Sequence, residues 1–124
     1  MALGGNYQVE EINARGVEPV VIADPGSSGA IDVSRSGYVE LTTAGAETRT
    51  LADPVFRGQV LDIVFIADGG NCVVTAASAV NQTGNNTITF TDVGEHTRLV
   101  GAYNATDGWE WKTVVNDGAA LTTV

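Results

Sequence analysis

The chain has 124 residues, a length that suits one domain with a hydrophobic core and leaves no room for a second. Its 15 acidic and 6 basic residues give a formal charge of −9, which argues against nucleic acids and acidic lipids as partners, because both would be repelled. Residues 1–5 carry no signal-peptide pattern, and the longest apolar run, 63–67, is too short to cross a bilayer. With one cysteine, Cys72, no intrachain disulfide can form. We therefore expect a soluble protein, made in a cytoplasm, that binds neither nucleic acid nor membrane.

In chain order, residues 1–17 come first, and their lack of a hydrophobic period predicts a flexible arm that becomes ordered only against a partner. From residue 18 onwards, short runs rich in valine and threonine alternate with glycine, proline and aspartate turns, a pattern typical of strands. The predicted strands are 18–23, 30–34, 37–43, 47–51, 59–67, 72–76, 87–91, 96–103 and 109–115. Between two of them, the Asp-Gly-Gly-Asn sequence of residues 68–71 predicts a hairpin turn. The last residues, 116–124, predict a loose tail or a segment donated to a neighbouring subunit.

Together these segments predict an all-β fold. The spacing of strands and turns favours an antiparallel β-sandwich or small jelly roll of about eight or nine strands, with an extended N-terminal arm. We expect a single sandwich domain over residues 18–115, flanked by the arm and the tail. No segment shows the apolar stripe of an amphipathic helix.

The strand over residues 59–67 is apolar on both of its faces. Leu61, Ile63 and Phe65 share one face, whereas residues of the other parity form the reverse face. Those residues are Val60, Val64 and Ile66. A strand that is apolar on both sides is covered on both sides, so it is either central in the fold or in contact with another subunit. We take the three residues of the reverse face as candidate interface residues.

Residues for catalysis or metal binding are not apparent. The lone histidine, His96, has no partner that would make a metal site or a catalytic base. Many carboxylates adjoin glycine or proline, as in Asp24-Pro25 and Asp107-Gly108, where turn formation accounts for them. Cys72 is most simply a small buried hydrophobic residue. We predict no enzyme activity, no cofactor and no metal.

Two tryptophans near the end of the chain allow two interpretations. Trp109 and Trp111 lie on the same face of the last strand, and together with Tyr103 they would suit stacking against a sugar ring. Glu110 and Lys112 occupy the opposite face, an alternation that favours tryptophans pointing into the core. A carbohydrate-binding site at the three aromatic residues remains the alternative.

Residues 37–115 resemble a family of tailed-bacteriophage virion proteins, the capsid decoration (cement) proteins and related small β-rich modules of heads and tail tips. The resemblance depends on a glycine–glutamine entry to a hydrophobic strand, Gly58-Gln59, and on a closing strand with tryptophans. The matching segments are 38–45, 48–54, 58–65, 88–90 and 102–111.

This resemblance implies a β-sandwich that forms a homotrimer on the capsid surface of a virion and binds neighbouring subunits of the major capsid protein. The resemblance does not specify which end of the chain contacts the shell. We expect residues 1–17 to do so, with Tyr7, Val9 and Ile12 as the candidate interface residues of that arm. A carbohydrate-binding or host-adhesion module of a phage tail is the second hypothesis, and a small hydrolase built on paired carboxylates is the third.

Overall fold

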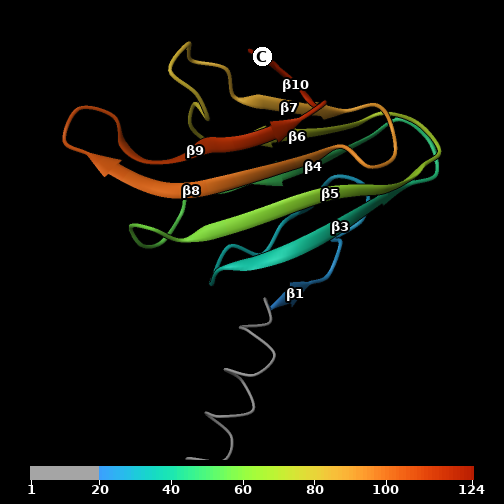
Figure 1. The fold of residues 1–124 in the computed structure, drawn as a ribbon, viewed down its shortest axis with the longest axis horizontal. Coiled ribbons are helices and arrows are strands. Elements are labelled where there is room, and N and C mark those ends of the chain that lie inside the picture. The colour runs from blue at the N-terminus through green and yellow to red at the C-terminus, as the bar shows by residue number, and fades with distance from the viewer. Residues whose placement is uncertain (1–19) are drawn as a thin grey trace, which may run out of the picture.

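The computed structural model describes residues 20–124. Within that range the chain is all-β, with ten strands and no helix (Figure 1). The strands are β1 (Val21–Ile22), β2 (Gly29–Ala30), β3 (Gly37–Thr43), β4 (Glu47–Leu51), β5 (Val60–Asp68), β6 (Cys72–Ala76), β7 (Thr87–Phe90), β8 (His96–Asn104), β9 (Gly108–Asp117) and β10 (Ala120–Thr122). The all-β prediction is thus confirmed for the described residues, whereas the predicted arm, 1–17, lies outside them.

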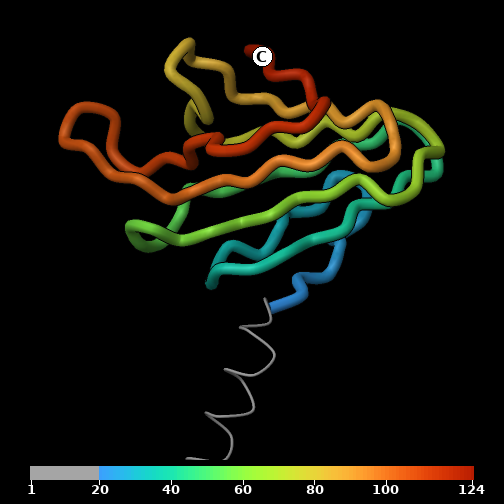
Figure 2. Tube along the Cα trace, in the orientation of Figure 1, coloured from blue at the N-terminus to red at the C-terminus, as the bar shows by residue number. Residues whose placement is uncertain are grey.

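The strands form two five-stranded sheets that pack face to face with the core between them (Figures 1 and 2). The first sheet has the order β1-β3-β5-β8-β9, and the second has the order β10-β7-β6-β4-β2. Each sheet combines three strands from the N-terminal half of the chain with two from the C-terminal half. This arrangement agrees with a β-sandwich.

The two halves of the chain pair differently. From β1 to β6 each strand lies in the sheet opposite to its predecessor, so the chain winds as a flattened coil, which the tube in Figure 2 follows. Consequently β1–β3, β3–β5, β2–β4 and β4–β6 pair in parallel, whereas the four pairs that involve β7, β8, β9 and β10 are antiparallel. The antiparallel prediction is therefore wrong for the coil, because a period of two residues describes strands of either direction equally well.

The turn at residues 69–71 shows why the predicted hairpin is also wrong. It joins β5 to β6, which belong to different sheets, and it packs against the turn before β4. A Cβ atom on Gly69 would lie 2.4 Å from the backbone of Thr43, and one on Gly70 would lie 2.4 Å from that of Gly45. These glycines are required because two stacked turns of the coil approach closely.

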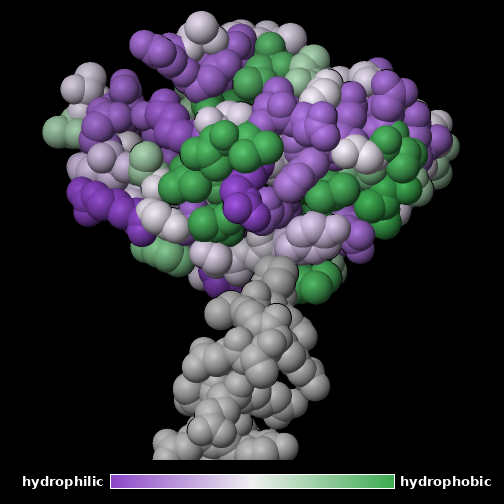
Figure 3. Space-filling model, viewed as in Figure 1, coloured by the Kyte–Doolittle hydropathy of each residue, from purple (hydrophilic) through white to green (hydrophobic). Residues whose placement is uncertain are grey.

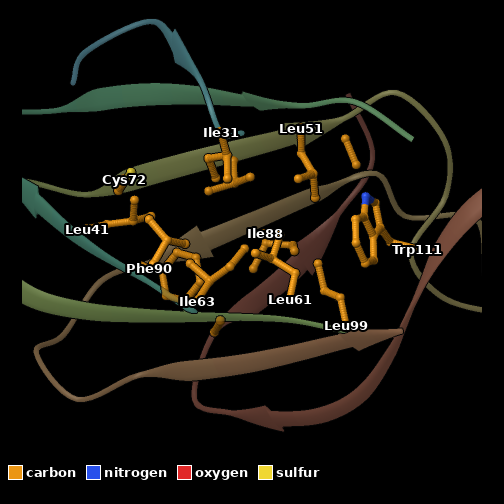
Figure 4. Packing of buried hydrophobic residues seen from close by; sticks show 14 of the residues in the cluster. Ile31, Leu41, Leu51, Leu61, Ile63, Cys72, Ile88, Phe90, Leu99 and Trp111 are labelled. Atoms are coloured by element: carbon orange, nitrogen blue, oxygen red, sulfur yellow. The ribbon is translucent and has the colours of Figure 1, made fainter. Parts of the chain in front are cut away.

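The core lies between the two sheets and is formed by alternate residues of the long strands (Figure 4). Leu61, Ile63 and Phe65 of β5 are fully buried, as the alternation predicts. Phe65 meets Phe90 of the opposite sheet with ring centroids 6.1 Å apart. At one end of the core, buried Trp111 donates a hydrogen bond from Nε1 to the Ala52 carbonyl at 2.8 Å. This bond satisfies the only polar atom of the indole, as burial requires.

The chain end is part of the second sheet. Where the sequence predicts a loose tail, β9 continues to Asp117 and β10 pairs antiparallel with β7. Buried Ala119 and half-buried Leu121 contact the core and provide the apolar contact that holds this segment. The tail prediction failed because its alternation covers only three residues, too few for a period to be recognised.

Candidate binding surfaces

The first sheet presents a mixed apolar and charged outer surface, which we call the valine face. It consists of outward-pointing residues of three neighbouring strands, β3, β5 and β8. In Figure 3, hydrophobic atoms gather in separate areas over β5, β8 and β9, with hydrophilic atoms between them. The outward residues are Tyr38, Glu40, Val60, Asp62, Val64, Ile66, His96, Arg98, Val100 and Ala102.

The three candidate interface residues of β5 lie on this face. Val60 and Val64 are half-buried, and Ile66 is 41% exposed. Val60 is paired with Val100 across the sheet, so that two valines form one apolar area. The reverse side of β5 therefore presents partly exposed apolar side chains on both sides of Asp62. The other three candidates, Tyr7, Val9 and Ile12, lie outside the described residues.

A charged cluster divides the valine face. The Asp62 carboxylate accepts hydrogen bonds from Arg98 Nε at 2.8 Å and Arg98 Nη2 at 3.2 Å, and its Oδ1 lies 2.9 Å from His96 Nε2. Burial opposes the ionisation of Asp62, but the hydrogen bonds from Arg98 and His96 outweigh that effect and hold the pKa of the carboxyl below its ordinary value. The Arg98 side chain is 51% exposed and can therefore reach a second partner. Thus the single histidine acts here as one member of an ion-pair cluster.

The second sheet has an outer surface of a different kind, which we call the threonine face. Four threonines form one row across neighbouring strands: Thr50, Thr75, Thr87 and Thr122. The next row holds Thr48, Val73, Thr89 and Ala120. None of these outward strand residues is charged, although the whole chain has a formal charge of −9. The two outer faces of the sandwich therefore differ in both charge and chemical character.

The two tryptophans have different surroundings. Trp111 is buried in the core, as the alternation favours, whereas Trp109 is half-buried at the tip of the β8–β9 hairpin. The Trp109 ring lies 5.0 Å from that of Tyr103, its cross-strand partner, and Tyr103 is 44% exposed. Above both rings lies the guanidinium of Arg57, 5.0 Å and 5.7 Å from their centroids. Two of the three predicted stacking residues are thus together at the surface, and Trp111 is not with them.

A polar pocket lies on the other side of the same hairpin. Its volume is about 630 Å³, and the loop between β6 and β7 forms its second wall. Its lining residues are Ser78, Ala79, Asn81, Gln82, Gly84, Asn104, Asp107, Glu110 and Lys112. Glu110, which the alternation assigns to solvent, is only 5% exposed because it lies at the base of this pocket. Sequence reasoning missed the pocket, since its two walls lie far apart in the chain.

The cysteine and the acidic residues remain as candidates for a reactive thiol and for a metal site. Cys72 is fully buried, and this burial raises the pKa of its thiol. Across residues 20–124, no three His, Cys, Asp or Glu side chains lie close enough together to hold a metal ion. The same range contains no helix long and apolar enough to cross a membrane.

No protein-family model matches the sequence, and no curated protein is significantly similar to it.

Proposed function

We propose that this chain is a structural virion protein that decorates and stabilises a phage capsid, binding the major capsid protein as a homotrimer. The observation that supports the proposal best is the contrast between its two outer faces. A decoration protein needs one surface that docks on the shell and one that faces the solvent. The valine face suits the first role, and the threonine face suits the second.

The valine face has the composition of a docking surface. Val60, Val64 and Ile66 provide apolar area, while Arg98, a residue type enriched in binding hot spots, lies beside them. Apolar residues give a contact its affinity, and the charged groups between them select its orientation. On the threonine face, uncharged β-branched side chains form no comparable apolar area.

The net charge favours a basic partner. A charge of −9 would steer the chain towards a positively charged surface of another protein and away from packaged nucleic acid. This steering would speed association with a capsid site of opposite charge. It would also weaken as ionic strength rises.

The test is cosedimentation of the purified chain with phage shells that lack a decoration protein. We expect the unaltered chain to bind and V64D to lose at least tenfold in affinity, because a carboxylate would then lie within the apolar docking area. T50D, which places the same charge on the threonine face, is the matched control and should bind normally. Light scattering during size exclusion should give the mass of a trimer. A monomer that fails to bind shells contradicts the proposal, as does an equal loss in both variants.

A second candidate function, carbohydrate binding or host adhesion at a phage tail, is favoured by the Tyr103–Trp109–Arg57 cluster. Exposed aromatic rings stack on the apolar faces of sugars, and the arginine above them can donate hydrogen bonds to hydroxyls. A glycan array probed with the unaltered chain and with W109A tests this carbohydrate-binding function. Binding that W109A removes would support this function, and an empty array would exclude it for the glycans displayed.

A further inference from the structure

The polar pocket beside the β8–β9 hairpin has no role in capsid docking as proposed above. It lies at the end of the sandwich where the β6–β7 loop and the hairpin tip come together, which Figure 1 shows in yellow and orange. Its volume of about 630 Å³ falls within the range of small-molecule sites in proteins. From the polar groups of its walls, we infer that this pocket binds a neutral, hydroxyl-rich ligand such as a sugar residue.

The walls of the pocket are held in place by amides that bond within their own segments. Asn81 donates from Nδ2 to Asn85 at 2.9 Å, and its Oδ1 accepts the Asn85 backbone N–H at 2.9 Å. In the hairpin, Asn104 Oδ1 accepts the backbone N–H groups of Thr106 at 3.0 Å and of Asp107 at 2.7 Å. These bonds fix both loops before any ligand arrives, which reduces the entropy cost of binding.

Glu110 forms the base of the pocket and is already oriented. Its Oε1 accepts a hydrogen bond from Asn104 Nδ2 at 3.1 Å and forms an ion pair with Lys112 Nζ at 3.0 Å. The side chain is only 6% exposed, yet no hydrogen bond from another described residue reaches its Oε2. A carboxylate oxygen that its neighbours have not saturated is a strong acceptor for a ligand hydroxyl.

Other polar groups of the lining are also free to bind. Ser78 and Gln82 make no side-chain hydrogen bond within the described chain, and the Asp107 carboxylate is exposed at the rim. Lys112 has further ammonium protons beyond the one directed to Glu110. The pocket thus offers acceptors and donors side by side. A hydroxyl group suits such a set because it donates to a carboxylate and accepts from an amide or ammonium at once.

The charges disfavour an ionic ligand. Asp107 and Glu110 outnumber Lys112, and the whole chain is acidic, so an anion would be repelled. A cation would compete with Lys112 for the carboxylate that Lys112 already neutralises. A neutral polyol faces neither difficulty. Because the pocket is polar and open, we expect weak binding, with a dissociation constant on the order of 1 mM.

The test is a ¹⁵N–¹H NMR titration of the full chain with the methyl glycosides of glucose, galactose, mannose and N-acetylglucosamine. At least one probe should cause saturable shifts in residues 78–84 and 104–112. E110Q should weaken binding about tenfold, because the glutamine keeps Oε1 for its neighbours but loses one charged acceptor. E40Q makes the same change at Glu40, an exposed residue of β3. It is the matched control and should leave binding unaltered. Q82A removes an exposed loop amide, and we expect it to weaken binding while the fold is retained.

Each alternative outcome identifies a different explanation. If none of the four glycosides causes saturable shifts, the inference is wrong. It is also wrong if E110Q and Q82A both bind like the unaltered chain. Shifts confined to Tyr103 and Trp109 would support the aromatic site and overturn the pocket. Saturation by ethylammonium chloride, without any by the glycosides, would overturn the neutral ligand. The capsid-binding proposal is unaffected by any of these results, since V64D tests it separately.

Discussion

Two arginines of this protein bind an aspartate with the same geometry and differ in almost every other respect. Arg49 donates to both carboxylate oxygens of Asp24, at 2.8 and 3.1 Å, and Arg98 donates to both of Asp62, at 2.8 and 3.2 Å. The Arg49 side chain is completely buried, whereas that of Arg98 is 51% exposed. Because both ion pairs make the same two hydrogen bonds, the difference in burial must decide how much each pair contributes to the stability of the fold.

Arg49 joins three segments of the parallel coil. Besides Asp24 in the β1–β2 connection, it donates to Glu47 Oε1 at 3.0 Å and to the carbonyl of Thr42 in β3 at 3.0 Å. Among residues 20–124, Arg98 makes no such additional bonds, and its side chain is half-exposed. The comparison suggests that the first pair stabilises the fold and that the second is available to a partner. Three experiments test this division, from the largest expected effect to the smallest.

Removing the buried arginine should have the largest effect. R49M deletes the guanidinium and leaves Asp24 and Glu47 as partly buried carboxylates without their common partner, so we expect a loss of about 3–5 kcal/mol in the free energy of unfolding. Urea denaturation monitored by tryptophan fluorescence measures it. R98M is the matched control and should leave the free energy of unfolding almost unaltered, because Arg98 is half in solvent. Equal losses in the two variants would refute the division.

Acid should weaken both pairs, and the buried one more. Burial opposes ionisation of Asp24, but hydrogen bonds from Arg49 and from the backbone of Thr42 and Gly26 outweigh it, so that its pKa in the folded chain is lowered. Its contribution is therefore complete above the unfolded pKa of about 3.9 and is lost as the pH falls through the lower folded value. The same sign holds for Asp62.

We accordingly expect D24N to cost about 2 kcal/mol at neutral pH and D62N about 1 kcal/mol. Both differences from the unaltered chain should shrink as the pH is lowered below about 4. Urea unfolding at a series of pH values measures them. A deficit that stays constant down to the acid limit would mean that the aspartates act through something other than their charge.

Changing the exposed arginine should affect binding while leaving stability almost unaltered. R98A removes a charged anchor from the valine face, and we expect about a fivefold to tenfold weaker association with shells. The free energy of unfolding should stay close to that of the unaltered chain, because an exposed ion pair contributes little to stability. Cosedimentation measures the affinity for shells, and urea denaturation of the same preparation measures the free energy of unfolding. Unchanged binding would remove Arg98 from the proposed docking surface.

The two arginines also show how far the sequence predicts the structure. Local patterns are enough to find the strands: β3, β4 and β6 have the predicted bounds, and β5 is the central strand of its sheet, one of the two positions that its apolar faces predicted. Arg49 has the same parity as Leu51 on β4, which is a signal that it points inward. Its partner Asp24, however, is far away in sequence, and composition alone explains that residue as part of a turn.

Features that depend on pairing could not be predicted. The Asp62 cluster exists because β8 lies beside β5 with Asp62 opposite Arg98, a register that no local pattern specifies. Likewise, the rows of the threonine face require parallel pairing of β4 with β6, and the sequence favoured antiparallel pairs. The polar pocket needs both a hairpin and a remote loop. Local chemistry predicts which residues alternate, and only the arrangement of strands determines which of them meet.

The winding of the N-terminal half has a consequence for the order of folding. Successive strands from β1 to β6 lie in opposite sheets, so none of them can pair with the strand that precedes it in the chain. Such non-local pairs must overcome the entropy of loop closure before they gain contacts, whereas β8 and β9 are joined by a short turn at 105–107. We expect pulsed hydrogen exchange during refolding to protect the β8–β9 hairpin before β3. The parallel coil would then assemble against an antiparallel template that the C-terminal half of the chain supplies.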